Sequence, residues 1–264
     1  MYFKNIPNVP YRFGDMNDEA MITNLTAYSE VLDTVKGNAA FYQDYYIQHD
    51  ERPDHVAYKL YKNPQLHWTI YLLNPKLREN GWPLSDLEVL EKVKKQYPDT
   101  TLNTNEDISS TFQVGQVVTG QMSGASGVVV RRNLDLGQII VSVDSSLPPF
   151  RTDGERITSV VGETVQAIDI VSSEDEHQSL RHWVDDVEYA VDKNEDPDES
   201  LTQRYAYTSR LDVPRDPDTD NPLAAEVSHY DHYVAENNSL KQIRVVRPGN
   251  IREIVSAFIA AVGS

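Results

Sequence analysis

The chain has 264 residues, a formal net charge of −17 at pH 7 and no cysteine. This length allows two small domains with extended arms, and the missing cysteines exclude disulfide bonds and thiolate zinc sites. The negative charge opposes binding to nucleic acid, whose phosphates it would repel, so we expect basic protein surfaces as partners and no nucleic acid.

The N-terminal region, residues 1–40, is expected to form an arm followed by one or two helices. Residues 1–16 combine aromatic side chains with prolines and a glycine, a composition that suits neither a helix nor a central strand. This arm would lie either on its own domain or on another subunit. The sequence shows no cleavable signal and no apolar run of ~18 residues, which predicts a chain that is not exported and does not enter a membrane.

Residues 41–97 are expected to form a compact unit in the order strand, helix, helix, strand. A β-prone run at residues 45–47 comes before a turn at Arg52 and Pro53. The Asp54 carboxylate is expected to cap the first helix. Apolar residues at helical spacing give this helix one apolar face, made of Val56, Ala57, Leu60 and Tyr61.

A second helix is predicted from Asn63, whose side chain would cap it, with Pro64 at its first position. It should end at Asn74, because a proline follows and disfavours helical geometry at the residue before it. A short extended piece at residues 82–84 would close the unit as its second strand. The capping-box spacing of residues 85–88 predicts a further helix, with an inner face of Leu87, Leu90 and Val93.

The pattern A-x-x-L-Y-x-N-P-x-L-x-W-x-I-x-x-x-N, which spans Ala57 to Asn74, resembles the helix pair of a LysM module. The longer stretch from Tyr45 to Leu90 is similar, more narrowly, to the baseplate wedge subunit of contractile-tailed, T-even-type bacteriophages, the gene 53 product family. The LysM resemblance implies a βααβ fold. In cell-wall proteins, LysM modules bind N-acetylglucosamine polymers between loops that correspond here to residues 50–52 and 74–81.

Residues 98–111 are rich in Thr, Asn, Asp and Ser and are expected to be a linker. Residues 112–171 then change to short β-prone runs separated by turns, which predicts a small all-β barrel or sandwich inserted into the chain. The glycine-rich turn at residues 120–127 is not expected to hold phosphate, because a strand follows it where a phosphate loop needs a helix. The predicted strands are residues 114–119, 128–132, 138–143, 155–161 and 164–171.

Residues 172–227 are expected to be an extended acidic connector. Within them, residues 174–200 hold eleven acidic side chains against two basic ones. Such a density of like charge favours an extended, solvated chain. The acids do not follow the spacing of an EF-hand loop, so no calcium site is predicted.

Residues 228–264 are expected to form a strand and a closing amphipathic helix. The strand, residues 243–247, stops at Pro248, and Asn250 with Glu253 has the spacing of a capping box. The helix carries a continuous apolar stripe, which must be buried either on the chain's own LysM-like domain or among other subunits. The segment also resembles the C-terminal segment of the same phage family. The stripe consists of Ile251, Ile254, Val255, Phe258, Ile259 and Val262.

The chain carries no HExxH, GxSxG or kinase-type catalytic sequence. His229, Asp231 and His232 could form a metal pair or belong to an unrecognised hydrolase, but the tyrosines interleaved with them favour a packed surface. We therefore expect no enzyme, no cofactor and no metal ion.

The resemblance to the phage family implies a structural subunit of a contractile-tail baseplate wedge, which bridges neighbouring wedges and promotes assembly around the hub. Its partners would be other wedge proteins, hub and tube-proximal proteins and neighbouring wedges, with six copies set by the symmetry of the baseplate. It would be found in the tail baseplate of the virion, and in the host cytoplasm during assembly. The alternative is a LysM-type module that binds peptidoglycan or chitin oligosaccharides.

The expected architecture is α+β: a LysM-like βααβ module and an inserted small β-domain, with an N-terminal arm and a C-terminal strand and helix. Contacts to partner proteins are expected from the arm, from the helix pair and from the C-terminal segment, because aromatic and arginine side chains are enriched at interfaces. Trp68, Leu72 and Trp82 are candidates for the core as well. The expected contact residues are Tyr2, Phe3, Tyr11, Phe13, Trp68, Leu72, Trp82, Arg244, Arg247, Ile251, Ile254, Val255, Phe258 and Ile259.

Overall fold

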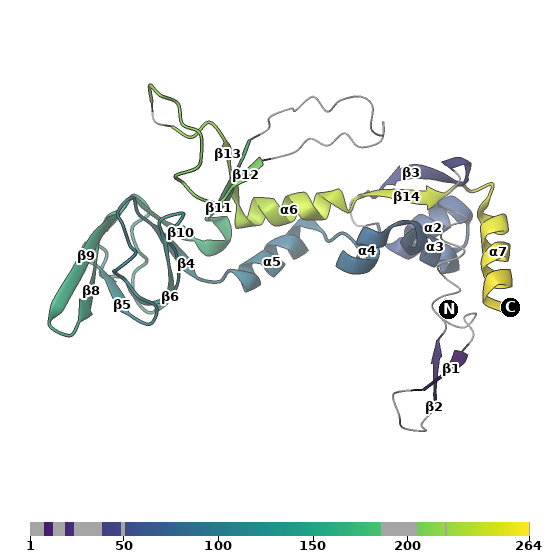
Figure 1. Ribbon diagram of the computed structural model, residues 1–264, viewed down its shortest axis with the longest axis horizontal. Coiled ribbons are helices and arrows are strands. Elements are labelled where there is room, and N and C mark those ends of the chain that lie inside the picture. The colour runs from purple at the N-terminus through teal and green to yellow at the C-terminus, as the bar shows by residue number, and fades with distance from the viewer. Residues whose placement is uncertain are drawn as a thin grey trace. The chain divides into compact units, whose positions relative to one another are not determined.

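The chain divides into two compact units, of which unit 1 is drawn from residues 1–85 and 236–264 and unit 2 from residues 86–235. Helices and strands occur together (Figure 1), which confirms the α+β class predicted from the sequence. The structure is a computed structural model that describes residues 8–12, 19–23, 39–48, 51–185, 205–219 and 221–263.

Unit 1 is a small layer of helices packed on two strands from opposite ends of the chain. Strand β3 pairs antiparallel with β14, from Tyr42 opposite Val246 to Tyr46 opposite Gln242. The elements of unit 1 are β1 (Asn8–Arg12), β2 (Glu19–Thr23), η2 (Ala39–Phe41), β3 (Tyr42–Tyr46), α2 (Pro53–Tyr61), η3 (Pro64–His67), α3 (Trp68–Leu73), α4 (Pro75–Asn80), β14 (Gln242–Val246) and α7 (Ile251–Gly263).

The partner of β3 differs from the sequence-based expectation. Residues 82–84 were the predicted second strand, but they form no strand, and β14 takes that place. Pro83 has no N–H group to donate to a ladder. The backbone N–H and C=O of Leu84 instead bond to the side-chain amide of Asn237, at 2.8 and 2.9 Å.

The N-terminal segment also differs from the expected arm and helices. Strands β1 and β2 pair antiparallel, with Asn8 opposite Thr23 and Arg12 opposite Glu19. Pro10 is tolerated in β1 because, among the described residues, this sheet has two strands and both are therefore edge strands. The other residues of the predicted region 1–40, apart from Ala39 and Ala40, lie outside the described residues.

The predicted helix pair is present, with one change at its start. Helix α2 begins at Pro53, one residue before the expected cap, and its N-cap residue Arg52 makes no side-chain capping bond. The cap at Asn63 is as predicted, because its side chain accepts a hydrogen bond from the Gln65 N–H at 3.0 Å. The pair ends at Leu73, directly before Asn74 and its following proline, as expected.

Two apolar clusters hold unit 1 together. The first lies between α2, α3, α4 and the inner face of the strands, and contains Ile47, Val56, Ile70, Leu77, Ile243 and Val245. The second joins α7 to the same unit through Leu73, Val246, Ile251, Ile254 and Phe258. The Phe258 ring lies 4.5 Å from the Trp68 ring, so the apolar stripe of α7 packs on the chain's own unit over the described part of that helix.

Unit 2 is built on a seven-stranded antiparallel sheet in the order β10-β4-β7-β6-β5-β8-β9. Its elements are α5 (Asp86–Gln96), β4 (Thr100–Asn103), β5 (Val117–Gly120), β6 (Ser126–Asn133), β7 (Gln138–Val143), β8 (Glu155–Val161), β9 (Thr164–Ile170), β10 (Ser172–Asp175), η4 (Glu176–Gln178), β11 (Leu180–Asp185), β12 (Tyr205–Tyr207), β13 (Ala225–Ser228) and α6 (His229–Ser239).

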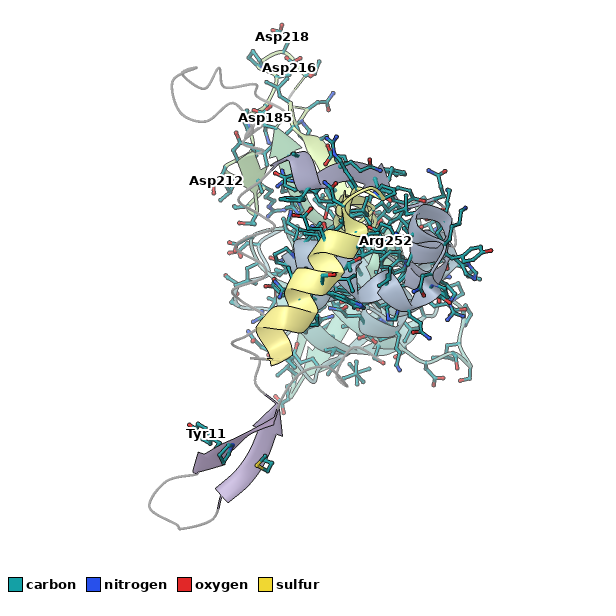
Figure 2. The ribbon with its side chains drawn as sticks, turned by 90° about the vertical axis from the view of Figure 1, so that its right-hand side faces the viewer. Tyr11, Asp185, Asp212, Asp216, Asp218 and Arg252 are labelled. Carbon is teal, nitrogen blue, oxygen red and sulfur yellow. The ribbon has the colours of Figure 1, made fainter. Side chains whose placement is uncertain are left out.

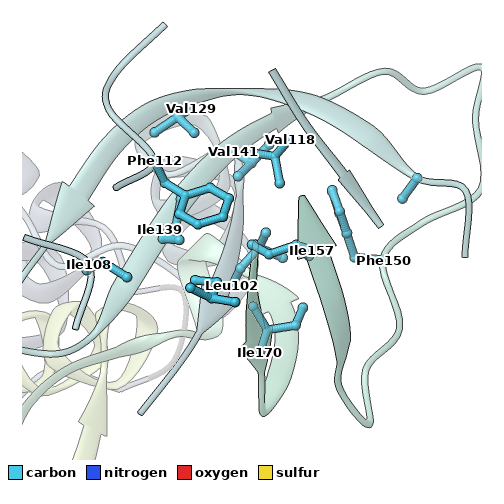
Figure 3. Packing of buried hydrophobic residues seen from close by; sticks show 12 residues of the cluster. Leu102, Ile108, Phe112, Val118, Val129, Ile139, Val141, Phe150, Ile157 and Ile170 are labelled. Atoms are coloured by element: carbon cyan, nitrogen blue, oxygen red, sulfur yellow. The ribbon is translucent and has the colours of Figure 1, made fainter. Parts of the chain in front are cut away.

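The end strands of this sheet, β9 and β10, are separated in the chain by Val171 alone, whose N–H donates to the Asn103 carbonyl at 2.8 Å. The sheet is therefore curled, and one cluster of apolar side chains fills its inner face (Figure 3). Leu102, Phe112 and Ile139 in that cluster are fully buried. In helix α5 the buried residues are Val89 and Val93, whereas Leu87, predicted on the inner face, is exposed.

The linker predicted at residues 98–111 is wrong, because β4 lies inside the sheet between β10 and β7. The acidic connector predicted at residues 172–227 is also wrong over its described part. It supplies β10 and a three-stranded sheet, β12-β11-β13, with a small core around Trp183 and Val213. Polar composition was misleading in both places. In β4, for example, Leu102 is the one residue that enters the apolar core, so the strand looks polar in the sequence. Residues 186–204 of the connector lie outside the described residues.

Glu155 ties two turns of unit 2 to the sheet. Its buried carboxylate accepts backbone hydrogen bonds from Met122 at 2.9 Å, Ser123 at 3.0 Å and Arg151 at 3.0 Å. A Cβ on Gly120 would lie 2.7 Å from this carboxylate, which explains the glycine. Burial favours the neutral acid, but the three N–H donors outweigh it and hold the pKa of Glu155 below its ordinary value of 4.5.

We expect Phe258→Ala to lower the free energy of unfolding of unit 1 by about 3 kcal/mol or more, because it leaves a cavity against Trp68. Urea unfolding followed by the fluorescence of Trp68 and Trp82, in a Trp183→Phe background, measures this. Ser256→Ala, on the exposed side of α7, is the matched control. A loss no larger than that of the control would contradict the packing of α7 on unit 1.

We expect Glu155→Gln to cost about 2 kcal/mol of stability near pH 7, because the amide leaves a buried N–H donor without an acceptor. The folded-state pKa is depressed, so the carboxylate stabilises unit 2 above pH 4.5, and this contribution is lost as the pH falls through the folded pKa. The difference between wild type and variant should therefore shrink in acid. Urea unfolding, monitored by Trp183 fluorescence at pH 7 and at a pH below the folded pKa of Glu155, checks this. Glu163→Gln, on the exposed β8–β9 turn, is the control.

Candidate protein interface

The outward face of the β3 and β14 pair is an exposed surface of unit 1. Side chains alternate along each strand, so Ile243 and Val245 point into the core, where they are 3% and 0% exposed. The residues between them point outward. Cross-strand register places Gln242 opposite Tyr46, and Arg244 opposite Asp44, on that outward face.

Helix α7 covers one end of this face and leaves the other open. Val246 and its cross-strand partner Tyr42 belong to the cluster under α7. Figure 2 shows this helix in front of unit 1, with its exposed residue Arg252 labelled. We call the open end, made of Asp44, Tyr46, Gln242 and Arg244, the β3–β14 face; all four residues are exposed.

Two arginines are held in place beside Tyr42. The Arg244 guanidinium carbon lies 5.1 Å from the centre of the Tyr42 ring, within the range of a cation–π interaction. The Arg247 Nε donates to the Tyr42 carbonyl oxygen at 2.9 Å. Exposed arginines that are already restrained lose less conformational entropy on binding, and arginine and tyrosine are enriched where proteins bind one another. This surface therefore suits contact with another protein.

Asn74 fixes the position of β14. Its Nδ2 donates to the carbonyl oxygens of Ile70 and Arg244, each at 2.7 Å, and its Oδ1 accepts from the Arg244 N–H at 2.9 Å. The side-chain amide thus pairs with the edge of β14 as a neighbouring strand would. Tyr61 closes the next position by donating its hydroxyl to the Val246 carbonyl at 2.9 Å, and burial raises the pKa of Tyr61 to about 12.

The loop that the LysM resemblance assigned to sugar binding is already engaged within the chain. The Glu51 carboxylate accepts from the Tyr45 hydroxyl at 2.8 Å, from the Lys59 ammonium at 2.9 Å and from the Gln48 N–H at 2.9 Å. Burial favours the neutral acid, but these donors outweigh it and lower the pKa of Glu51. The Glu51 carbonyl also accepts from the Trp82 indole N–H at 2.6 Å.

Unit 2 exposes a strip of valines on the outer face of its sheet. Val117 lies opposite Val128 across β5 and β6, and Val160 lies opposite Val165 across β8 and β9. The β5–β8 register, with Thr119 opposite Thr158, continues to place Val117 beside Val160. All four valines are exposed, and an apolar strip of this kind is typical of surfaces that contact other proteins.

The predicted contact residues divide into four groups. Leu72, Ile251, Ile254 and Phe258 are buried within unit 1, so they are not on its surface. Trp68, Trp82 and Val255 are half-buried, whereas Tyr11 (labelled in Figure 2), Arg244 and Arg247 are exposed. Tyr2, Phe3, Phe13 and the side chain of Ile259 lie outside the described residues.

The sequence-based reasoning missed Asp44, Tyr46 and Gln242. The period-two pattern of the strands was the available clue, because Gln242 and Arg244 alternate with the apolar Ile243 and Val245. It could not be used without knowing that β3 and β14 pair. The outward side chains of one strand define a surface only together with those of its neighbour.

The histidines considered for catalysis or metal binding are packing groups in unit 2. The His229 ring is stacked on Tyr97 with ring centres 4.1 Å apart, and its Nδ1 is buried. Burial and the nearby Arg181 lower the pKa of His229 to about 4, so the ring is neutral at pH 7. His232 makes edge contacts with His182 and Tyr233. No group of three His, Cys, Asp or Glu side chains suited to a metal ion occurs in the described part of the chain.

Restrained arginines, exposed tyrosines and an apolar strip are features that are common on surfaces that contact other proteins. Residues 9–110 of the chain match the family model described as base plate wedge protein 53. This match confirms the resemblance to the phage baseplate wedge family. No protein of the curated collection matches the chain.

The matched family consists of structural proteins of the phage baseplate and is not a known class of enzymes. The match therefore supports a structural role in the tail baseplate of the virion, in association with other baseplate components. It gives no support to the glycan-binding alternative. Within the described residues, no helix is long and apolar enough to cross a membrane.

We expect Asn74→Asp to destabilise unit 1 by about 2 kcal/mol near pH 7, because a carboxylate cannot donate to the Ile70 and Arg244 carbonyls. Protonation restores one donor, so the deficit should become smaller in acid. Urea unfolding read from Trp68 and Trp82 measures both effects. Asn80→Asp, on the exposed end of α4, is the matched control, and equal stabilities of the two variants would contradict the clamping role of Asn74.

Proposed function

We propose that the protein is a structural subunit of a contractile-tail baseplate wedge that bridges neighbouring wedges and promotes assembly of the baseplate around its hub. The observation that carries this proposal is the match of residues 9–110 to the wedge family. Its partners are other wedge proteins, hub and tube-proximal proteins and neighbouring wedges. It acts in the virion tail, after a period in the host cytoplasm during assembly.

The construction of unit 1 supports a bridging role. A bridge must keep its contact surfaces in fixed geometry, and here the strand pair is held by Asn74, Tyr61 and the packing of α7. Permanent interfaces in assemblies bury on the order of 2,000 Å² or more and are rather apolar. The valine strip of unit 2 supplies apolar surface of this kind, and Tyr46 supplies an aromatic side chain on the β3–β14 face.

The β3–β14 face is the surface that we assign to a partner subunit. Arg244 and Tyr46 lie on adjacent strands of one outward face, and both residues are exposed. Arginine and tyrosine are both enriched among the residues that carry most of the binding energy of interfaces. The copy number of six would follow from the symmetry of the baseplate, since each wedge would present the same pair of contact surfaces.

The test is incorporation of variants into wedges. Arg244→Glu combined with Tyr46→Ala should lower incorporation by at least about tenfold, because truncated interface centres typically cost 2 kcal/mol or more. Co-expression with the other wedge proteins, followed by sedimentation and gel analysis, measures the incorporated fraction. Lys76→Glu, an equal charge reversal on α4, should enter wedges as the wild type does. Normal entry of the double variant would refute the assignment of this face.

A further inference from the structure

Unit 2 contains a cavity of about 330 Å³ at one end of its curled sheet. Three neighbouring strands end there, since β4 begins at Thr100, β7 ends at Val143 and β10 ends at Asp175. Phe150, in the loop between β7 and β8, forms part of the wall. The cavity is thus the mouth of the sheet's interior, and its size is near the lower limit of ligand sites, about 300 Å³.

The wall of this cavity is apolar on one side and polar on the other. Val143 and Phe150 contribute apolar surface. Ser173 lies opposite Leu102 in the β10–β4 register, so its side chain is directed to the inner face of the sheet. Ser173 is 6% exposed and lines the cavity, so its hydroxyl is a polar group at the inner wall. A hydroxyl in this position can accept a hydrogen bond from a donor that enters the cavity.

The charge of the cavity is negative. The Asp175 side chain is exposed at the mouth and makes no hydrogen bond or ion pair with the described residues. Glu174 also lines the cavity, and burial raises the pKa of its carboxyl. Glu174 donates nothing and accepts from the Asn103 amide at 2.6 Å. The nearby Arg151 is paired with Asp153, its Nε donating at 2.9 Å, so it does not neutralise Asp175. His177, beside Asp175, has its pKa lowered by burial, which favours its neutral form.

We propose that this cavity receives the side chain of an arginine from another baseplate protein, with the guanidinium group at Asp175 and Ser173 and the methylene stem against Phe150 and Val143. Arginine fits because its guanidinium presents five donors in one plane, which matches a set of separate acceptors. Its aliphatic stem is buried favourably on apolar surface. The proposal rests on the proposed function only for the identity of the donor protein.

The direct test is to titrate the isotope-labelled full chain with Nα-acetyl-arginine methylamide and to monitor its backbone amide resonances by NMR. Saturable shifts are expected at Ser173, Asp175 and Gln178, and the neutral citrulline analogue should bind at least about tenfold more weakly, since charged hydrogen bonds contribute that much. Shifts of the same size with citrulline, an equal affinity for the lysine analogue, or shifts confined to other parts of the chain would overturn the proposal.

Asp175→Asn should weaken binding of the arginine probe by about tenfold or more. The matched control is Asp135→Asn, which removes the same charge from the exposed turn before β7, at the opposite end of that strand from Val143. Ser173→Ala should weaken binding several-fold. Equal affinities of the Asp175 and Asp135 variants would count against the site, provided that both keep the thermal midpoint of the wild type.

Wedge incorporation separates this proposal from the proposed function. If the wild type enters wedges and Asp175→Asn is reduced while Asp135→Asn is not, the cavity is a docking site. If Asp175→Asn enters as well as the wild type, the docking role is refuted and the proposed function stands. Failure of the wild type itself to enter wedges would refute the proposed function, and the titration would still decide whether the cavity binds arginine.

Discussion

The pairing of β3 with β14 is the interaction on which unit 1 depends. It places Ile243 and Val245 over the apolar faces of α2 and α3, and without it those faces would be open to water. The chain between β3 and β14 is long, but the entropy cost of bringing its two ends together grows only with the logarithm of its length. A five-residue ladder, reinforced by Asn74 and by the cluster under α7, can therefore offset that cost. The family match covers residues 9–110 and therefore does not include β14, the strand that completes unit 1.

The outward face of the strands, which we propose as a binding surface, belongs to the same element that closes the core. The same two strands that close the core carry Arg244 and Tyr46 on their other side, so the position of this surface is fixed by the packing of the core. Fixing an arginine against Tyr42 before binding removes part of the entropy cost that a partner would otherwise meet. Stability depends on the inner face of the two strands, whereas the contact that we propose uses their outer face.

The acidic character of the chain is used in two ways. Several carboxylates are internal acceptors: Glu155 holds two turns, Glu51 holds a loop, and Glu176 bonds to the Asp99 N–H at 3.2 Å. Burial raises the pKa of Glu176, although Arg131 lies beside its carboxylate and opposes this effect. Asp175, by contrast, has no such internal partner among the described residues, and this difference rather than the net charge marks the cavity.

The sequence by itself determined the local elements: the helix pair with its Asn63 cap and Asn74 stop, the strand-rich region and the closing amphipathic helix. These follow from short-range patterns that a few neighbouring residues encode, and the phrase around them carried the family resemblance. Only the tertiary structure decided that β14 and not residues 82–84 completes the strand pair, and that β4 belongs to a sheet. Strand pairing joins residues far apart in the chain, and neither periodicity nor composition specifies which strand meets which. For the same reason the β3–β14 face and the cavity beside Asp175 could not be read from the sequence, because each is assembled from segments that only folding brings together.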